Sequence, residues 1–180
     1  LLVMAEREGR YIAGAINFVS KDPSDSLTGS ALLNVSSLHE RNANVYVSGP
    51  LGRVKYTCFT GANFQEAVDV DGDGWSDVAN IRTYVVHPQA FLSPWKAAKL
   101  RVGGVYQHDQ RTGGNMHALD ATEDTALYFL RTSGERIGAD MSLEHTLSSA
   151  SMLVAKGSAN RYTQQDRTNF TRTLREQANR

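Results

Sequence analysis

Hydrophobic and polar residues alternate along much of the chain with a period of two, which is typical of β-strands whose two faces meet different surroundings. The clearest segment is residues 136–144, where Ile137, Ala139, Met141 and Leu143 alternate with charged or small residues. The same pattern predicts strands over residues 30–37, 42–48, 54–64 and 100–108, although Leu32 and Val105 fall on the polar side. Poorer alternation predicts further strands over residues 81–92, 125–131 and 150–162. The sequence therefore predicts an all-β fold.

The expected connections are of two sizes. Short, turn-like segments lie at residues 49–52, 93–96 and 133–135 and around residues 148–149, and longer polar segments lie at residues 66–80, at 110–121 and from 164 onward. Short and long connections tend to alternate, which favours an antiparallel up-and-down meander with two different rims. Strands of about ten residues with this asymmetry are typical of a transmembrane β-barrel. A soluble β-sandwich or barrel gives the same alternation with its apolar face as the core, so periodicity leaves both open.

Composition and charge exclude several classes of function. Lys plus Arg number 19 and Asp plus Glu number 19, so there is no basic excess and we expect no nucleic-acid partner. One cysteine excludes an internal disulfide and a cysteine-cluster zinc site. The longest apolar run, residues 1–5, is far short of the roughly 20 residues of a spanning helix. Since no nucleophile motif, phosphate loop or metal-binding histidine spacing occurs, we do not expect an enzyme.

Several segments of the chain carry, in order, the features of one known family. Residues 14–21, Gly-Ala-Ile-Asn-Phe-Val-Ser-Lys, resemble the stretch that closes the plug domain of TonB-dependent outer-membrane receptors. Residues 45–52 are similar to its second barrel strand and periplasmic turn, and an acidic Asp-Gly-Asp-Gly loop and a strand through His87 and Pro88 follow. Residues 111–114, Arg-Thr-Gly-Gly, lie where receptors of the cobalamin and colicin-receptor type carry Arg-x-Gly-Gly. The resemblance covers about residues 9 to 165.

This resemblance implies a domain organisation and a function. Residues 1–24 would be the end of the plug domain, and residues 25–180 the N-terminal portion of the β-barrel, a fragment of a 22-stranded transmembrane barrel. The whole receptor would take up a scarce nutrient, an iron chelate (siderophore) or a cobalamin-like molecule, across the bacterial outer membrane. The implied partners are outer-membrane lipid, the small-molecule nutrient, and TonB acting through the plug portion that precedes this chain. On the strand at residues 136–144 we expect Arg136, Asp140 and Glu144 to face the barrel lumen.

Residues 69–77 form an acidic loop whose spacing of carboxylates indicates a metal site more clearly than any other segment. The candidate metal ligands are the carboxylates of Asp69, Asp71, Asp73 and Asp77. They occupy positions 1, 3, 5 and 9 of the loop, and Gly74 occupies position 6, as at the start of a calcium-binding loop. Position 12 is Asn80 rather than a bidentate glutamate, so an EF-hand is not expected. Two hypotheses stay open: a Ca²⁺ site, and a solvated acidic loop without a cation.

A second candidate site is the segment that follows the strand at residues 100–108. The Arg111 guanidinium could bind a carboxylate or phosphate group, and the glycines of the segment would let a ligand approach the backbone. The candidate ligand-binding residues are Arg111, Gly113, Gly114, Asn115 and His117. A loop ordered only by its own turn is the simpler alternative. The competing function for the whole chain is a soluble extracellular β-domain whose acidic loop binds calcium for structure or adhesion.

Overall fold

The fold is known from a computed structural model that describes residues 6–7, 10–11, 22–120, 127–168 and 172–177. The segment at residues 14–21, which resembles a plug end, lies outside the described residues. Near the start of the chain, β1 (Glu6–Arg7) pairs antiparallel with β2 (Arg10–Tyr11).

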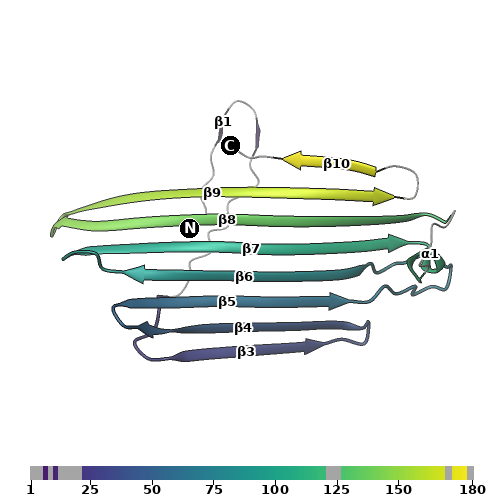
Figure 1. The fold of residues 1–180 in the computed structure, drawn as a ribbon, viewed down its shortest axis with the longest axis horizontal. Helices are drawn as coiled ribbons and strands as arrows, with labels where there is room; N and C mark the ends of the chain where they lie inside the picture. The colour runs from purple at the N-terminus through teal and green to yellow at the C-terminus, as the bar shows by residue number, and fades with distance from the viewer. Residues whose placement is uncertain (1–5, 8–9, 12–21, 121–126, 169–171, 178–180) are drawn as a thin grey trace.

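All other strands in the described ranges form a single antiparallel sheet of eight strands, each beside its neighbour in the sequence (Figure 1). In order these are β3 (Thr28–Val35), β4 (Glu40–Leu51), β5 (Val54–Gln65), β6 (Asn80–Leu92), β7 (Ala98–Gly114), β8 (Phe129–Ser148), β9 (Ser151–Thr168) and β10 (Arg172–Gln177). The five-residue helix α1 (Met116–Asp120) follows β7. The predicted all-β, up-and-down meander is confirmed, and the sheet is open, with β3 and β10 at its edges.

The predicted turn at residues 133–135 is wrong. These residues lie inside β8, which runs without interruption from Phe129 to Ser148 and so joins the strands predicted at residues 125–131 and 136–144. Residues 125 and 126 lie outside the described part of the chain. Ser133-Gly134-Glu135 has the composition of a turn, but Gly134 pairs with Asp109 of β7 and Gln164 of β9. A Cβ atom at Gly134 would come within 2.8 Å of an Asp109 carboxylate oxygen and of the Tyr162 hydroxyl. The glycine therefore makes room for neighbouring side chains instead of turning the chain.

The two ends of the sheet carry different connections (Figure 1). At one end β4, β6 and β8 are joined to the next strand by residues 52–53, 93–97 and 149–150, and we call this the turn end. At the other end the connections are residues 36–39, 66–79 and 115–128, and we call this the loop end. The predicted alternation of short and long connections holds from β4 to β9, whereas the loop-end connection at residues 36–39 is as short as those of the turn end. Strands β7 and β9 extend further toward the loop end than predicted.

The strand register gives the sheet one apolar and one polar face. Directly paired residues of adjacent strands point to the same side. Val102 pairs with Met141, for example, while the adjacent Arg101 pairs with Ser142. The apolar face carries, on β6 to β8, Tyr84, Val86, Pro88, Ala90, Leu92, Leu100, Val102, Tyr106, Ile137, Ala139, Met141 and Leu143. The polar face carries Arg136, Asp140 and Glu144, as the alternation predicts.

Burial on this sheet is the reverse of that in a water-soluble protein. Among the described residues the only buried hydrophobic side chains are Ala98 and Ala118, whereas Met141 and Ile137 of the apolar face are about half exposed. Five of the six buried polar side chains belong to the polar face: Ser48, Thr57, Gln65, Gln89 and Ser142. Across β4 to β8 the polar face is thus the more sheltered side of the sheet and the apolar face is the more open one, whereas both faces of β3 and of residues 151–161 of β9 are exposed.

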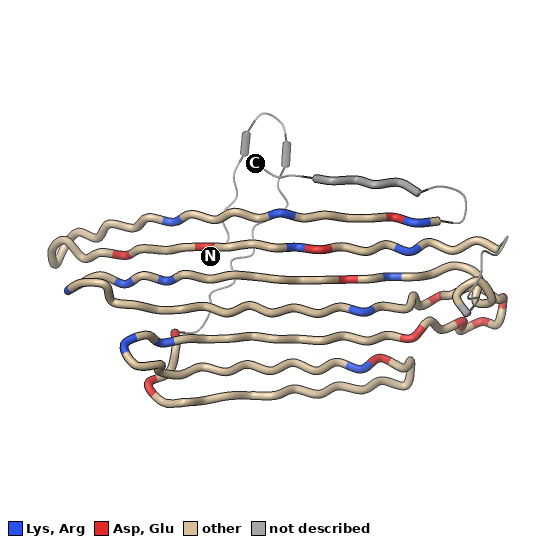
Figure 2. The backbone as a smooth tube through the Cα atoms, viewed as in Figure 1, with Lys and Arg blue, Asp and Glu red and all other residues tan. Residues whose placement is uncertain are grey.

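The exposed apolar residues form a band across the strands. On β6 the band runs from Tyr84 to Leu92, which is about 26 Å at the usual rise per strand residue. Aromatic rings mark both borders: Phe64 packs edge-on against Tyr84 toward the loop end, and Trp95 packs edge-on against His145 at the turn end. Figure 2 shows that charged residues are sparse along the middle of β3 to β6. No helix in the described part of the chain is both long and apolar enough to span a membrane.

Candidate functional site

The candidate ligand-binding segment stands at the loop end of β7. Arg111, Gly113 and Gly114 are among the last residues of the strand, Asn115 follows it, and His117 lies in α1. Gly114 has a φ of 136°, and a Cβ atom there would come within 2.5 Å of the Tyr128 carbonyl oxygen. Only glycine can occupy that position without strain. Because Arg111 belongs to the polar face, opposite Thr132, its guanidinium is on the opposite side of the sheet from the apolar band.

This segment and the acidic loop form one assembly, although more than 30 residues separate them in the sequence. Ser76 N donates to the Gly114 carbonyl at 2.9 Å, and Gly114 N donates to Ser76 Oγ at 2.9 Å. Met116 N donates to the Gly74 carbonyl at 2.9 Å. Trp75 forms an isolated bridge with Asn115, and its ring lies 6.1 Å from that of Tyr128. The two sites predicted separately from the sequence are therefore neighbours at one rim of the sheet.

Asp69 organises the acidic loop. One of its carboxylate oxygens accepts from Gly72 N and the other from Gly74 N, each at 2.7 Å. These hydrogen bonds, chiefly that from Gly74, lower the pKa of Asp69 below its ordinary value, since they favour the charged form. Gly72 and Gly74 have φ values of 80° and 85°, a conformation that side-chain-bearing residues rarely adopt. The glycines of the Asp-Gly-Asp-Gly sequence are therefore needed for the shape of the loop.

Three of the four predicted metal ligands come together. Carboxylate oxygens of Asp69, Asp71 and Asp77 lie within 4.8 Å of one another, a donor set suited to a hard cation such as Ca²⁺. Asp73 is not in this group, and its carboxylate accepts from Trp75 N at 2.8 Å. The loop is thus ordered by its own backbone hydrogen bonds, and a cation would add to that order.

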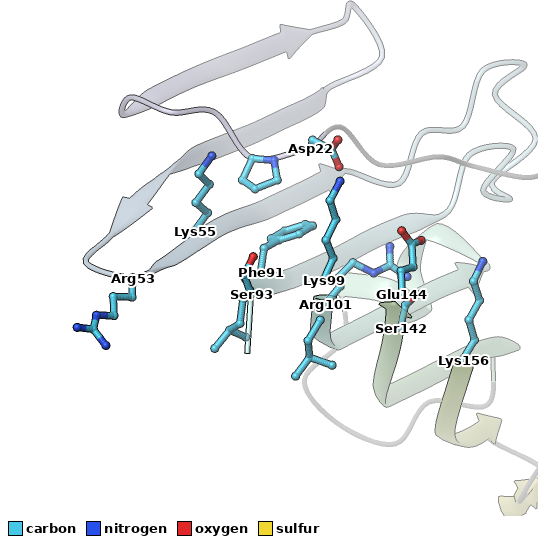
Figure 3. A pocket seen from close by; sticks show the side chains of 13 residues that line it. Asp22, Arg53, Lys55, Phe91, Ser93, Lys99, Arg101, Ser142, Glu144 and Lys156 are labelled. Atoms are coloured by element: carbon cyan, nitrogen blue, oxygen red, sulfur yellow. The ribbon is translucent and has the colours of Figure 1, made fainter. Parts of the chain in front are cut away.

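The polar face has a hollow of about 520 Å³ at the turn end, which the pattern of the sequence did not predict (Figure 3). Its lining includes Lys55, Lys99, Arg101, Glu144 and Lys156 from β5, β7, β8 and β9, together with Asp22 of the segment that precedes β3. In Figure 3, Lys99 extends toward Asp22, and Arg101 and Glu144 reach into the hollow from the neighbouring strands β7 and β8. The hollow is therefore lined by charges of both signs.

Ion pairs hold parts of this hollow in place. Arg101 Nη2 lies 3.3 Å from Asp140 Oδ2 on the neighbouring strand, and Lys55 pairs with the exposed Asp25. The Lys55 ammonium lowers the pKa of Asp25 below its ordinary value. Ser24 N donates to Ser48 Oγ at 3.0 Å, so the segment before β3 is attached to the polar face. One sequence signal could have indicated the hollow, because all of its strand cations occupy polar-face positions near predicted short turns.

Comparison of this chain with protein-family models, with characterised proteins and with solved structures found no match. Its function must therefore be inferred from the geometry of its two faces and two rims, together with the chemistry of the residues there.

Proposed function

We propose that this chain forms part of the wall of a transmembrane β-barrel in the bacterial outer membrane, in a receptor that takes up a scarce nutrient with TonB-supplied energy. The observation that carries the proposal is the reversed burial: apolar side chains such as Met141 are exposed, while polar ones such as Ser48 are sheltered. Hydrocarbon would cover the apolar face, and water or protein in the lumen would meet the polar face.

The dimensions of the sheet support a membrane position. The apolar band on β6 is about 26 Å long, close to the roughly 25 Å band of outer-membrane barrels. Outer-membrane barrels also combine short periplasmic turns with longer external loops, which matches the turn end and the two long connections of the loop end at residues 66–79 and 115–128. In lipid, the open edges at β3 and β10 require further strands to satisfy their backbone N–H and C=O groups. The proposal includes those strands, as in the 22-stranded receptors that the sequence resembles.

The nutrient would first meet the loop end. The exposed Arg111 side chain there could bind a carboxylate or phosphate group, and the rim around it is ordered by the bonds between Gly114 and Ser76. An iron chelate or a cobalamin-like molecule carries acceptor groups of this kind. In this proposal the rim captures the ligand, and the polar face below it lines the passage.

A Ca²⁺ ion at Asp69, Asp71 and Asp77 is a separate part of the proposal. Three carboxylates within 4.8 Å repel one another, and none of them forms an ion pair with a cation in the described part of the chain. A divalent cation would offset that repulsion. Isothermal titration with Ca²⁺ should give a binding heat that Asp71→Asn weakens, whereas Asp25→Asn, at the turn end, should leave it unchanged. No heat with the unaltered protein would remove the calcium site and leave the membrane proposal intact.

The competing function, a soluble extracellular β-domain, requires a different arrangement of the same sheet. Its apolar face would have to be the covered core. Among the described residues nothing covers Ile137, Met141 and Val102, each of which is exposed. This function would gain support if the natural polypeptide stayed monodisperse in plain buffer without detergent.

Fractionation and uptake together test the proposal. In the source bacterium the protein should be found in the outer membrane, and deletion of its gene should abolish uptake of one radiolabelled ferric chelate or cobalamin. Dissipating the proton-motive force should abolish the same uptake in the parent strain, because TonB depends on it. Recovery of the protein only in a soluble fraction would overturn the membrane assignment. A membrane location with every uptake unchanged would overturn the transport assignment alone.

A further inference from the structure

A second hollow, of about 460 Å³, lies on the apolar side of the sheet at the loop end, just beyond the border of the apolar band. Its polar lining includes Arg82 of β6, Gln110 and Thr112 of β7, and Arg131 of β8. Helix α1 supplies Met116 and Leu119 as an apolar wall. With Asn80 and Glu66 also in the lining, the hollow combines two guanidinium groups, two amides, a hydroxyl and one carboxylate with an apolar side. Its net positive charge suits an amphiphile with an anionic headgroup.

The two arginines lack carboxylate partners in the described part of the chain. Arg82 is exposed and belongs to none of the ion pairs found there. Arg131 Nε donates to Thr112 Oγ1 at 3.3 Å, which fixes the side chain near the hollow and leaves its terminal nitrogens for another acceptor. Glu66, the acidic residue of the lining, lies 3.2 Å from Arg41 instead. An anion between Arg82 and Arg131 would therefore meet uncompensated positive charge.

The neighbouring strand β9 adds to this charge. Arg131 is directly paired with Arg167 on β9, so both residues belong to the same face. Like charges directly opposite each other destabilise a sheet. Such a pair is easier to maintain where an anion lies against it, and the anion would have to approach from the apolar side of the sheet.

The strand geometry fits one headgroup between the two arginines. Arg82 pairs with Gln110, and Arg131 pairs with Thr112, so the arginines flank β7 with an offset of two residues. Strands β6 and β8 are about 10 Å apart at the usual interstrand spacing, and two extended arginines can bridge that gap to a shared phosphate. Along β6 the next residue on the same face toward the turn end is Tyr84, where the apolar band begins.

We propose that this hollow binds the phosphate headgroup of an anionic membrane lipid whose acyl chains lie along the exposed apolar band. The arginines donate charge-assisted hydrogen bonds to the phosphate, as guanidinium groups commonly do. Basic side chains at the edge of a membrane-embedded surface attract anionic lipid in the same way. The inference rests on the proposed membrane position, because only there does the band continue into hydrocarbon.

Lipid retention by the natural polypeptide that contains this chain tests the inference. The protein is incorporated into nanodiscs of equimolar phosphatidylcholine and phosphatidylglycerol, re-extracted in mild detergent, and its co-purifying lipid is quantified by mass spectrometry. We expect enrichment of phosphatidylglycerol, reduced about tenfold in the double variant Arg82→Gln, Arg131→Gln. Arg136→Gln is the matched control, because Arg136 lies on β8 but on the polar face, where it donates to Asn160 at 3.2 Å. It should retain phosphatidylglycerol as the unaltered protein does.

The remaining outcomes separate failure of the lipid site from failure of the proposed function. Incorporation without enrichment, or equal enrichment in the double variant, overturns the lipid site and leaves the membrane wall standing. Equal loss in the Arg136→Gln control would show nonspecific charge attraction and also overturns the site. Displacement of the lipid by dilute inorganic phosphate as effectively as by phosphatidylglycerol would identify a free-phosphate site instead. Failure of the unaltered protein to enter any nanodisc would overturn the proposed function itself.

Discussion

Met141 on β8 lies directly opposite Val102 on β7, and the two side chains are 49% and 41% exposed. One residue further along, Ser142 lies opposite Arg101 and is 7% exposed. Adjacent positions of one strand therefore differ as a membrane wall requires, with the apolar position open and the polar one sheltered. This relationship gives the account its most accessible mutational test.

Met141→Arg should destabilise the protein in a bilayer by about 2–4 kcal/mol, because it places a charge on the lipid side near the middle of the band. Ser158→Arg is the matched control: Ser158 is exposed, lies on the polar face of β9 and is paired with Asp140. It should cost less than about 1 kcal/mol. Urea unfolding in lipid vesicles measures both changes. Equal tolerance of the two arginines would contradict the assignment of the faces.

Gly134→Val should destabilise the sheet by about 1–3 kcal/mol, a typical cost of overpacking. The added side chain would displace the Asp109 carboxylate and the Tyr162 hydroxyl, each 2.8 Å from the position of its Cβ atom. At Gly157, on the apolar face of β9, a Cβ atom meets nothing within 4 Å, so Gly157→Val should be neutral or stabilising. Thermal unfolding of the two variants compares them directly. A neutral Gly134→Val would contradict the role of this glycine in making room for those two side chains.

The faces of the sheet could be predicted because they depend only on local alternation. The spacing of Ile137, Met141 and their neighbours is enough to predict which face of the sheet they occupy, and the strand register confirms that face. The error at Gly134 has the same local origin. A serine, a glycine and a glutamate in succession indicate a turn when only the local sequence is considered. The reason for the glycine is the Asp109 side chain, 25 residues earlier, which occupies the space that a Cβ atom at Gly134 would need.

The sites were predicted less completely, because they depend on pairing between distant strands. The sequence indicated Asp69, Asp71 and Asp77 but also Asp73, whose carboxylate accepts from Trp75 within its own turn. It did not indicate that the acidic loop is bonded to Gly114, nor that Arg82 and Arg131 line one hollow. These relationships require the register of β6, β7 and β8, which alternation alone does not supply.

The acidic loop should lose order in acid. The lowered pKa of Asp69 means that its contribution to stability is present above the ordinary carboxyl pKa, about 3.9, and is lost as the pH falls through the lower folded value. Fluorescence of Trp75, read in a Trp95→Phe background, should therefore change as the pH falls below about 4. Asp69→Ala should give the acid spectrum already at neutral pH, because Gly72 and Gly74 lose their acceptor.

In calcium-free buffer, where the proposed cation site plays no part, Asp71→Ala serves as the control for that experiment. The Asp71 carboxylate accepts a longer bond, 3.2 Å, from Asp73 N, and no comparable pair of glycine donors depends on it. Its removal should leave the Trp75 spectrum nearer to that of the unaltered loop. An identical response of the two variants would show that Asp69 has no special role in ordering the loop.

Cys58 offers a direct view of the apolar face, because it is the single cysteine of the sequence and is paired with Val47 and Pro88 inside the band. A nitroxide attached to it in lipid vesicles reports its surroundings through collisions with dissolved oxygen, which concentrates in hydrocarbon, and with a water-soluble nickel chelate. The account predicts that oxygen dominates at Cys58, and that nickel dominates at a label on Ser158→Cys in a Cys58→Ser background. Nickel collisions as frequent at Cys58 as at position 158 would contradict a lipid-facing sheet.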